Sequence, residues 1–297
     1  MKIDLYKIAA QFADIEFFLA CVFPGSAPEF SGNRADLAVV SKSGFWAVTS
    51  RACNNGLGLV HDLPTSQLVF RGYEAVLGVH SYSTPAELER IAAPDDLVNG
   101  AFVYLKFDPQ RQQATVRSDA FGFAPLYYRQ QGGAWFFASH PSLIHFEGDE
   151  PDLTSWISLM QNGSALGDRS FYRGITRFPA GVQMTIGHAC AETVQWFDFN
   201  KLPPGTEKID DQAFGIVEDA YCAAMERCLK LNVGEVTLPF SSGFDSRRFF
   251  GTLIRKAVSF KAVTCQTFHR KGGRDYDIDS FFAPKIAAAF GVECELV

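Results

Sequence analysis

The spacing of apolar residues changes near residue 205, and this change constrains the chain more than any other feature of its sequence. Before it, short runs rich in β-branched and aromatic residues are separated by turn signals such as Asp108-Pro109 and Gly132-Gly133, a pattern typical of strands joined by hairpins. After it, Ile209–Leu231 carries apolar residues at helical spacing. The segment between them, Lys201–Thr206, contains Pro-Pro-Gly and is the clearest linker. We therefore predict two domains of different class, residues 1–200 and 207–297.

The first region is predicted to be rich in sheet, with a few helices. Its expected strands are Leu37–Val40, Gly44–Thr49, Gly100–Phe107, Ala114–Ser118, Leu126–Arg129, Ala134–Ala138, Gly181–Ile186 and Thr193–Phe197. Its expected helices are Ile8–Leu19, Pro85–Ile91 and Leu153–Met160.

The second region alternates strands and helices. After the first helix we expect strand Val236–Phe240, helix Arg247–Ala257, strand Phe260–Thr267, a helix capped by Asp279 or Ser280 that runs to Phe290, and strand Glu293–Val297. Pro284 fits that last helix only in its first turn, where a missing N–H costs little. This order predicts a parallel, doubly wound α/β sheet, of which the sequence contains only the beginning.

Composition excludes several classes of partner. The formal net charge of −6 argues against nucleic acid held by a basic surface. The seven cysteines are scattered, with no C-x-x-C, so they predict reduced thiols and not a disulfide framework or a zinc site. No apolar run approaches the length of a membrane span. We expect a cytoplasmic protein with no membrane partner.

The segment Ser241-Ser242-Gly243-Phe244-Asp245-Ser246 carries the most chemistry. It lies between a predicted strand and a predicted helix, so small residues bring backbone N–H groups and a helix N-terminus toward an anion. The hydroxyls of Ser241 and Ser246 can donate to phosphate oxygens, and Asp245 beside a phosphate is best explained as a Mg²⁺ ligand. Arg247 and Arg248 oppose the helix dipole unless an anion is bound. The alternative is a Ser/Asp helix cap with two solvated arginines.

This segment resembles the S-G-G-x-D-S pyrophosphatase loop of asparagine synthetases, β-lactam synthetases and lasso-peptide cyclases. Ser242 replaces the first Gly of that pattern, and Arg247 replaces a frequent Ser. The resemblance extends to Phe171–Gly181, Gln195–Asp198 and Asp277…Ala287…Gly291. It implies an adenine nucleotide α-hydrolase-like domain, C-terminally incomplete, with Asp245 as the metal ligand for Mg²⁺. The residues implied to bind ATP or pyrophosphate are Ser241, Ser242, Gly243, Phe244, Asp245, Ser246 and Arg247.

A second signature, Arg117-Ser-Asp119…Tyr128 followed by Phe137-Ala-Ser139, resembles the glutaminase domain of the same enzymes. It implies an N-terminal-nucleophile αββα sandwich (α+β class). Such a glutaminase needs Cys directly after the initiator Met, whereas position 2 is Lys, so we expect no glutaminase activity. Cys21 would serve only after cleavage at Ala20–Cys21. We interpret Arg117 and Asp119 structurally, as a buried pair or a turn anchor.

Two functions of different class follow from these resemblances. The first is an ATP-dependent amidoligase that adenylates a carboxylate substrate and forms an amide with ammonia or a substrate amine. The second is a non-catalytic nucleotide-binding or assembly protein, because in relatives the second Mg²⁺-binding acid and the catalytic residues lie beyond the last residue of this sequence. The expected partners are ATP, Mg²⁺, the carboxylate, and a homodimer or partner protein that completes the synthetase domain. The sequence identifies no catalytic residue.

Overall fold

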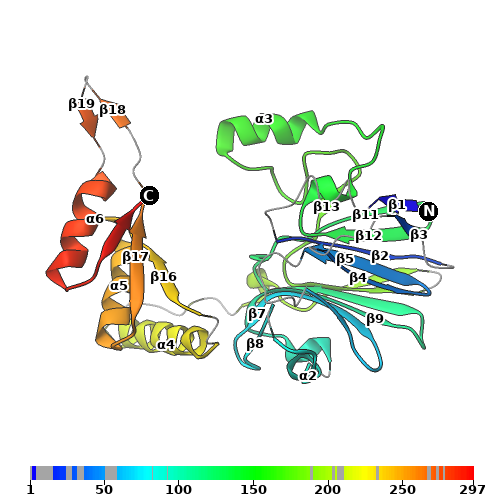
Figure 1. Cartoon of the computed structure of the whole chain (residues 1–297), viewed down its shortest axis with the longest axis horizontal. Coiled ribbons are helices and arrows are strands. Elements are labelled where there is room, and N and C mark those ends of the chain that lie inside the picture. Colours follow the sequence, from blue (N-terminus) through cyan, green and yellow to red (C-terminus); the bar gives the residue numbers. More distant parts are fainter. Residues whose placement is uncertain are drawn as a thin grey trace. The chain divides into compact units, whose positions relative to one another are not determined.

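The structure is a computed structural model, and it forms two compact units, Met1–Lys208 and Ile209–Val297 (Figure 1). Each unit is described by itself. The structure describes residues 2–4, 16–24, 29–31, 37–50, 59–81, 83–91, 93–187, 190–202, 205, 211–231, 234–265, 269–271, 274–276 and 278–297.

Two antiparallel sheets make up most of the first unit. The six-stranded sheet contains, in spatial order, β13 (Thr176–Arg177), β11 (Tyr127–Gln131), β12 (Ala134–Ala138), β2 (Phe18–Val22), β5 (Phe45–Ser50) and β4 (Leu37–Lys42). The seven-stranded sheet contains β15 (Ala191–Gln195), β14 (Val182–Ile186), β10 (Gln113–Ser118), β9 (Gly100–Asp108), β7 (Gln67–Glu74) and β6 (Val60–Asp62), with β8 (Val79–His80) also on β7. Apart from these, β1 (Lys2–Asp4) pairs with β3 (Glu29–Ser31).

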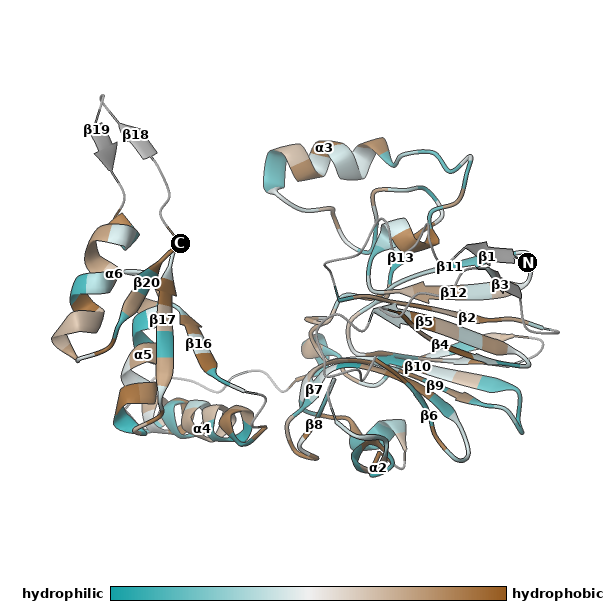
Figure 2. Cartoon of the chain, in the orientation of Figure 1, coloured by the Kyte–Doolittle hydropathy of each residue, from teal (hydrophilic) through white to brown (hydrophobic). Residues whose placement is uncertain are grey.

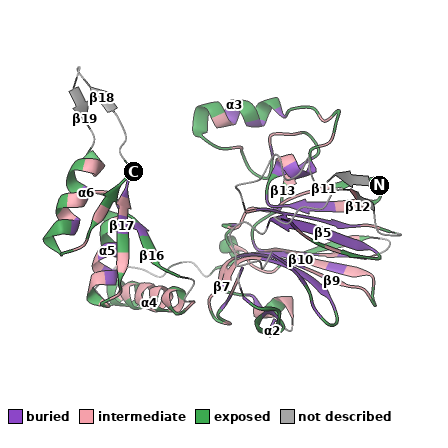
Figure 3. Ribbon diagram, in the orientation of Figure 1, coloured by how far each residue is buried: buried purple, intermediate pink, exposed green. Residues whose placement is uncertain are grey.

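The main core lies between the two sheets. Phe18, Ala20 and Val22 of β2 pack in one cluster with Val103, Leu105 and other residues from β7, β9 and β10 of the opposite sheet. Strands β2 and β5 are buried along their whole length (Figure 3). Burial on both faces favours continuous apolar runs over alternation. This explains why β2, Phe-Leu-Ala-Cys-Val, has no polar residue.

The outer faces of the two sheets are covered by short elements. On the seven-stranded sheet, Leu88 of α2 (Pro85–Leu88) and Leu97, which follows η1 (Pro94–Asp96), pack with Phe70 and Phe102. On the six-stranded sheet, Leu143 and Ile144 of η2 (Pro141–Ile144) pack with Trp46 and Val48. The αββα sandwich predicts a layer of helices on each outer face. In the described part of the chain, these short elements are what covers the two faces. Helix α3 (Leu153–Asn162) leaves Leu153, Ile157 and Met160 exposed.

The second unit contains a three-stranded parallel sheet in the order β16 (Val236–Pro239), β17 (Phe260–Thr264), β20 (Cys294–Leu296). Its helices are α4 (Asp211–Lys230), α5 (Phe244–Arg255) and α6 (Ile278–Ala289), and a hairpin is formed by β18 (His269–Lys271) and β19 (Arg274–Tyr276). Figure 2 shows both polar and apolar residues along α4, and among the apolar ones Phe214, Ile216 and Val217 are exposed. The core centres on Phe250, whose ring stacks on Phe240 with a centroid distance of 4.6 Å. The predicted parallel arrangement is confirmed for these three strands.

Two predicted helices need correction. The end of the predicted helix Ile8–Leu19 is wrong, because Phe18 and Leu19 belong to β2; residues 8–15 lie outside the described part. Pro284 lies inside α6 and not in its first turn, since α6 begins at Ile278. The ring there removes one backbone hydrogen bond, which packing of Ala283 and Ala287 in the core offsets. At the other end, Gly291 has a φ of 71°, as expected for a residue that ends a helix.

Candidate functional site

The Ser241–Ser246 segment follows β16, as the sequence predicts, but α5 begins at Phe244 and not at the predicted Arg247, so Phe244, Asp245 and Ser246 form its first turn. The hydroxyls of Ser241 and Ser246 lie 2.9 Å apart, and Ser246 Oγ also donates to the Ser241 carbonyl over 2.9 Å. Ser241 Oγ accepts a hydrogen bond from the N–H of Gly243 over 3.1 Å. These bonds hold the loop as a compact turn before the helix begins.

Helix α5 starts without a capping side chain. Its N-cap is Gly243, with φ −70° and ψ 163°, and no side chain accepts a hydrogen bond from the first turn within the described residues. The helical-cap alternative predicted such a bond from Ser or Asp, and the geometry does not contain it. The first N–H groups of a helix have no partner inside it. The N-terminus of α5 therefore presents free N–H donors and the positive end of the helix dipole, and both suit an anion.

Four of the predicted site residues are exposed at this end of α5, the N-cap Gly243 among them. Phe244, Asp245 and Arg247 all project from the first helical turn. The Arg247 guanidinium lies 4.6 Å from the centre of the Phe244 ring, and its Nε donates to the Gly243 carbonyl over 3.2 Å. Arg248 is turned elsewhere, to Glu218 of α4 at 2.7 Å. Arg247 is thus the cation held beside the loop.

Asp279 contacts the loop from α6, and the sequence reasoning missed this role. Its Oδ1 accepts hydrogen bonds from the N–H of Ser242 at 2.7 Å and from the hydroxyl of Ser242 at 2.6 Å. The sequence predicts Asp279 or Ser280 as the N-cap of α6, but this is wrong, because α6 begins at Ile278, before both. The available signal was topological: in a parallel sheet, the segments after neighbouring strands meet at one edge.

The exposed carboxylate of Asp245 is the group in the loop that suits Mg²⁺. Magnesium in nucleotide sites takes one or two carboxylates together with phosphate oxygens and water. No group of three or more His, Cys, Asp or Glu side chains suited to a metal occurs in the described ranges.

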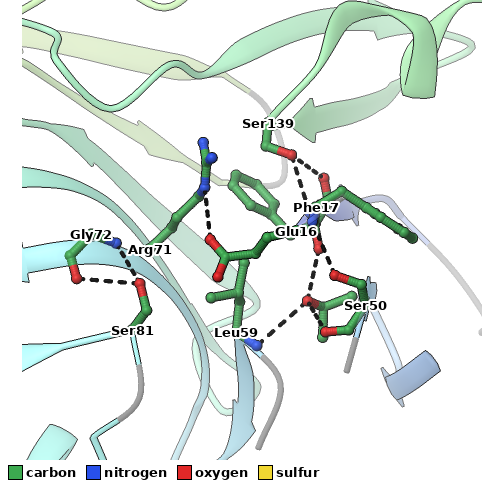
Figure 4. A network of polar contacts seen from close by, with 10 residues as sticks. Glu16, Phe17, Ser50, Leu59, Arg71, Gly72, Ser81 and Ser139 are labelled. Carbon is green, nitrogen blue, oxygen red and sulfur yellow. Dashed lines mark hydrogen bonds and ion pairs between the residues drawn. The ribbon is translucent and has the colours of Figure 1, made fainter. Parts of the chain in front are cut away.

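The first unit contains a second polar network, where the chain enters β2 (Figure 4). The N–H groups of Phe17 and Phe18 donate to the hydroxyls of Ser50 and Ser139, each over 3.1 Å. Beside them, Glu16 pairs with Arg71 of β7 at 3.3 Å. The Nη1 of Arg71 is buried and, within the described part of the chain, has no hydrogen-bond partner. Arg71 is a guanidinium suited to a carboxylate, and the chain supplies one in Glu16.

Cys21 lies in the middle of β2, between Phe136 of β12 and Trp46 of β5. Its side chain is fully buried, and burial raises the pKa of the thiol well above its ordinary value. A nucleophilic cysteine needs an exposed thiolate in a positively charged setting. Cys21 is therefore a core residue in this fold.

Arg117 and Asp119 are both buried, but they are not a pair. Asp119 accepts four backbone hydrogen bonds, from Phe102, Phe121, Phe123 and Ala124. This confirms the interpretation as a turn anchor. Arg117 pairs instead with Asp95 at 2.7 Å and lies 4.0 Å from the centre of the Trp196 ring.

Residues 93–197, which include this anchored turn, match the family model described as a glutamine amidotransferase domain. A search of the curated proteins finds no match for the chain. One similar solved structure is the glutamine phosphoribosylpyrophosphate (PRPP) amidotransferase from B. subtilis complexed with ADP and GMP: 10% identity, 95% of this chain and 84% of that chain covered, TM-score 0.33. Another is described as the allosteric regulatory enzyme of purine biosynthesis, with 10% identity, 95% and 74% covered, TM-score 0.32. At these scores neither structure bears on function.

Among the described helices, none is both long enough and apolar enough to span a membrane.

Proposed function

We propose that the chain is an ATP-dependent amidoligase of the asparagine-synthetase-like kind, without a glutaminase of its own. It adenylates a carboxylate, releases pyrophosphate, and lets ammonia or an amine of the substrate form the amide. The observation that carries the proposal is the uncapped start of α5, which begins at Phe244 within the Ser241–Ser246 segment. The amidotransferase-domain match over residues 93–197 supports the same family.

The residues of the loop would bind and orient the phosphates. Phosphate oxygens accept from the first N–H groups of α5 and from the hydroxyls of Ser241 and Ser246. Arg247 adds positive charge on the same turn, and Asp245 would hold Mg²⁺, which neutralises charge on the phosphates and on the leaving pyrophosphate. Catalysis of this kind depends on positioning and electrostatics, with little covalent chemistry from the protein.

Binding of ATP is the direct test. We expect calorimetric titration to detect ATP binding in the presence of Mg²⁺ and weaker binding after Mg²⁺ is removed with a chelator, because Asp245 repels an unshielded triphosphate. GTP at the same concentration serves as a control for recognition of the base. If titration with ATP in the presence of Mg²⁺ produced no heat of binding, the proposal would be contradicted.

We also expect no release of glutamate when the protein is incubated with glutamine. Cys21, the candidate thiol, is buried in mid-strand with a raised pKa, so it is neither accessible nor ionised. The Arg71 guanidinium, which would suit the carboxylate of glutamine, is already paired with Glu16. Glutamate can be measured with a coupled dehydrogenase assay, and Cys21→Ser should give the same background as wild type. Release that disappears in Cys21→Ser would contradict this expectation.

The second candidate is a nucleotide-binding protein without catalysis. What favours it is that Asp245 belongs to no group of three or more His, Cys, Asp or Glu side chains suited to a metal among the described residues. A ligase converts ATP to AMP and pyrophosphate when its carboxylate is present. ATP binding without AMP formation across a panel of amino acids and other carboxylates would favour this second candidate.

A further inference from the structure

One carboxylate oxygen of Asp279 takes both donors of Ser242. The bond from the backbone N–H is 2.7 Å long and the bond from the hydroxyl is 2.6 Å long. Hydrogen bonds of this length to an ionised acceptor are among the stronger ones in proteins. The contact joins residues from two elements, the loop after β16 and the first turn of α6, that are separated by 37 positions in sequence.

The parallel sheet explains why these residues meet. β16 and β17 run side by side in the same direction, with Pro239 opposite Val263. The segments that follow both strands therefore lie at the carboxyl edge of the sheet, where ligands of open α/β sheets bind. Asp279 lies in the first turn of α6 at this edge, and its carboxylate contacts Ser242 of the loop.

This carboxylate occupies donors that a phosphate would use. The N–H of Ser242 is bonded to Asp279, and the N–H of Gly243 is bonded to Ser241 Oγ. The N–H of Ser241 is bonded to Ser246 Oγ, so the first three N–H groups of the segment are already bonded within the protein. A phosphate that uses the N–H of Ser242 in addition to those of α5 has to displace the carboxylate, and it also meets the negative charge of Asp279.

We propose that Asp279 and Ser242 form a latch, which occupies the donors of Ser242 without nucleotide and must open before a phosphate can bind to them. The inference rests on the proposed nucleotide-binding function of the loop. It also gives a reason for Ser242, which stands where the S-G-G pattern has Gly: the hydroxyl provides a second bond to Asp279. A glycine there would provide the N–H alone. The latch is a regulatory contact within the site, and Asp279 acts through Ser242.

Two variants open the latch in different ways. Asp279→Asn removes the charge, and Ser242→Gly removes the hydroxyl bond. Inorganic pyrophosphate and ATP, each with Mg²⁺, are the probes for calorimetric titration. We expect Asp279→Asn to bind pyrophosphate about tenfold more tightly than wild type, since a charged acceptor is lost from the competing bonds. Ser242→Gly should show a smaller gain, about threefold.

Glu293→Gln is the matched control for the loss of one negative charge. Glu293 is exposed and precedes β20, so it lies at the opposite, amino edge of the sheet. Its variant should bind pyrophosphate as wild type does. A gain equal to that of Asp279→Asn would mean that net charge, and not the latch, controls affinity, and would overturn the proposal.

Hydrogen exchange of the Ser242 amide tests the latch without any ligand. The amide proton should exchange more slowly in wild type than in Asp279→Asn, because its acceptor is a carboxylate of the protein. Equal exchange would overturn the latch whatever the binding results. If wild type binds and both variants bind equally or more weakly, the latch is wrong and the proposed function stands. If no protein binds either probe, both proposals fail.

Discussion

Replacing Gly243 with Val is expected to remove binding of Mg·ATP, with a loss of at least about a hundredfold in affinity. The φ of Gly243 is −70°, so the backbone of the loop tolerates a side chain. A Cβ atom there meets only Ser241 Oγ, at 3.2 Å. Ser241 has to shift by a few tenths of an ångström, and the larger cost falls on the ligand, because a branched side chain covers the N-terminus of α5 that a phosphate has to approach. Calorimetric titration with Mg·ATP measures the loss.

Gly251→Ala is the matched control for Gly243→Val. Gly251 lies within α5, and no atom would lie within 4 Å of an added Cβ. Alanine favours the helix there by about 1 kcal/mol, and Mg·ATP affinity should not change. Asp245→Ala completes the series: the affinity for ATP should become nearly independent of Mg²⁺, because no other acid lies within the loop. Equal affinity for wild type and Gly243→Val would mean that the loop is only a turn before a helix.

Replacing Asp119 with Ala is expected to destabilise the first unit by about 4 kcal/mol or more. The carboxylate is fully buried and accepts backbone hydrogen bonds from Phe102, Phe121, Phe123 and Ala124. Alanine leaves these donors without their acceptor in the interior, and an unpaired buried donor costs more than a hydrogen bond contributes. The turn between β10 and β11 would lose its anchor.

Tryptophan fluorescence during urea unfolding measures this effect in the first unit alone. The chain has four tryptophans, Trp46, Trp135, Trp156 and Trp196, and all lie before residue 208. Asp119→Asn should show a smaller loss, since it keeps one acceptor oxygen and loses the charge. Glu192→Ala, at an exposed position of β15, should change stability by less than about 0.5 kcal/mol. A loss for Asp119→Ala as small as that for Glu192→Ala would show that the turn does not depend on this carboxylate.

Local patterns in the sequence predicted many elements of both units. Ala134–Ala138 is found as predicted, and Val236–Phe240 and Phe260–Thr267 differ from the observed strands by a few residues at one end. These segments have a clear apolar period and turn residues on either side. Where both faces of a strand are buried, the period disappears, and this is why β2 was predicted to end a helix.

The sequence by itself determined the positions of the loop and of Asp119. Ser241–Ser246 is contiguous, so a strand before it and a helix after it are enough to bring its side chains together. Asp119 anchors a turn whose donors lie mostly within five residues of it. Short-range interactions of this kind depend on local backbone geometry, which residue type and spacing predict.

Only the tertiary structure decided which distant charges meet. Arg117 pairs with Asp95 and not with its near neighbour Asp119, because β10 ends at Ser118 and the Asp119 carboxylate is occupied by backbone N–H groups of the turn that follows. Glu16 meets Arg71 across the two sheets, and Asp279 reaches Ser242 across the edge of the parallel sheet. Contacts between residues this far apart in sequence depend on strand order and register, which no local pattern of residues contains.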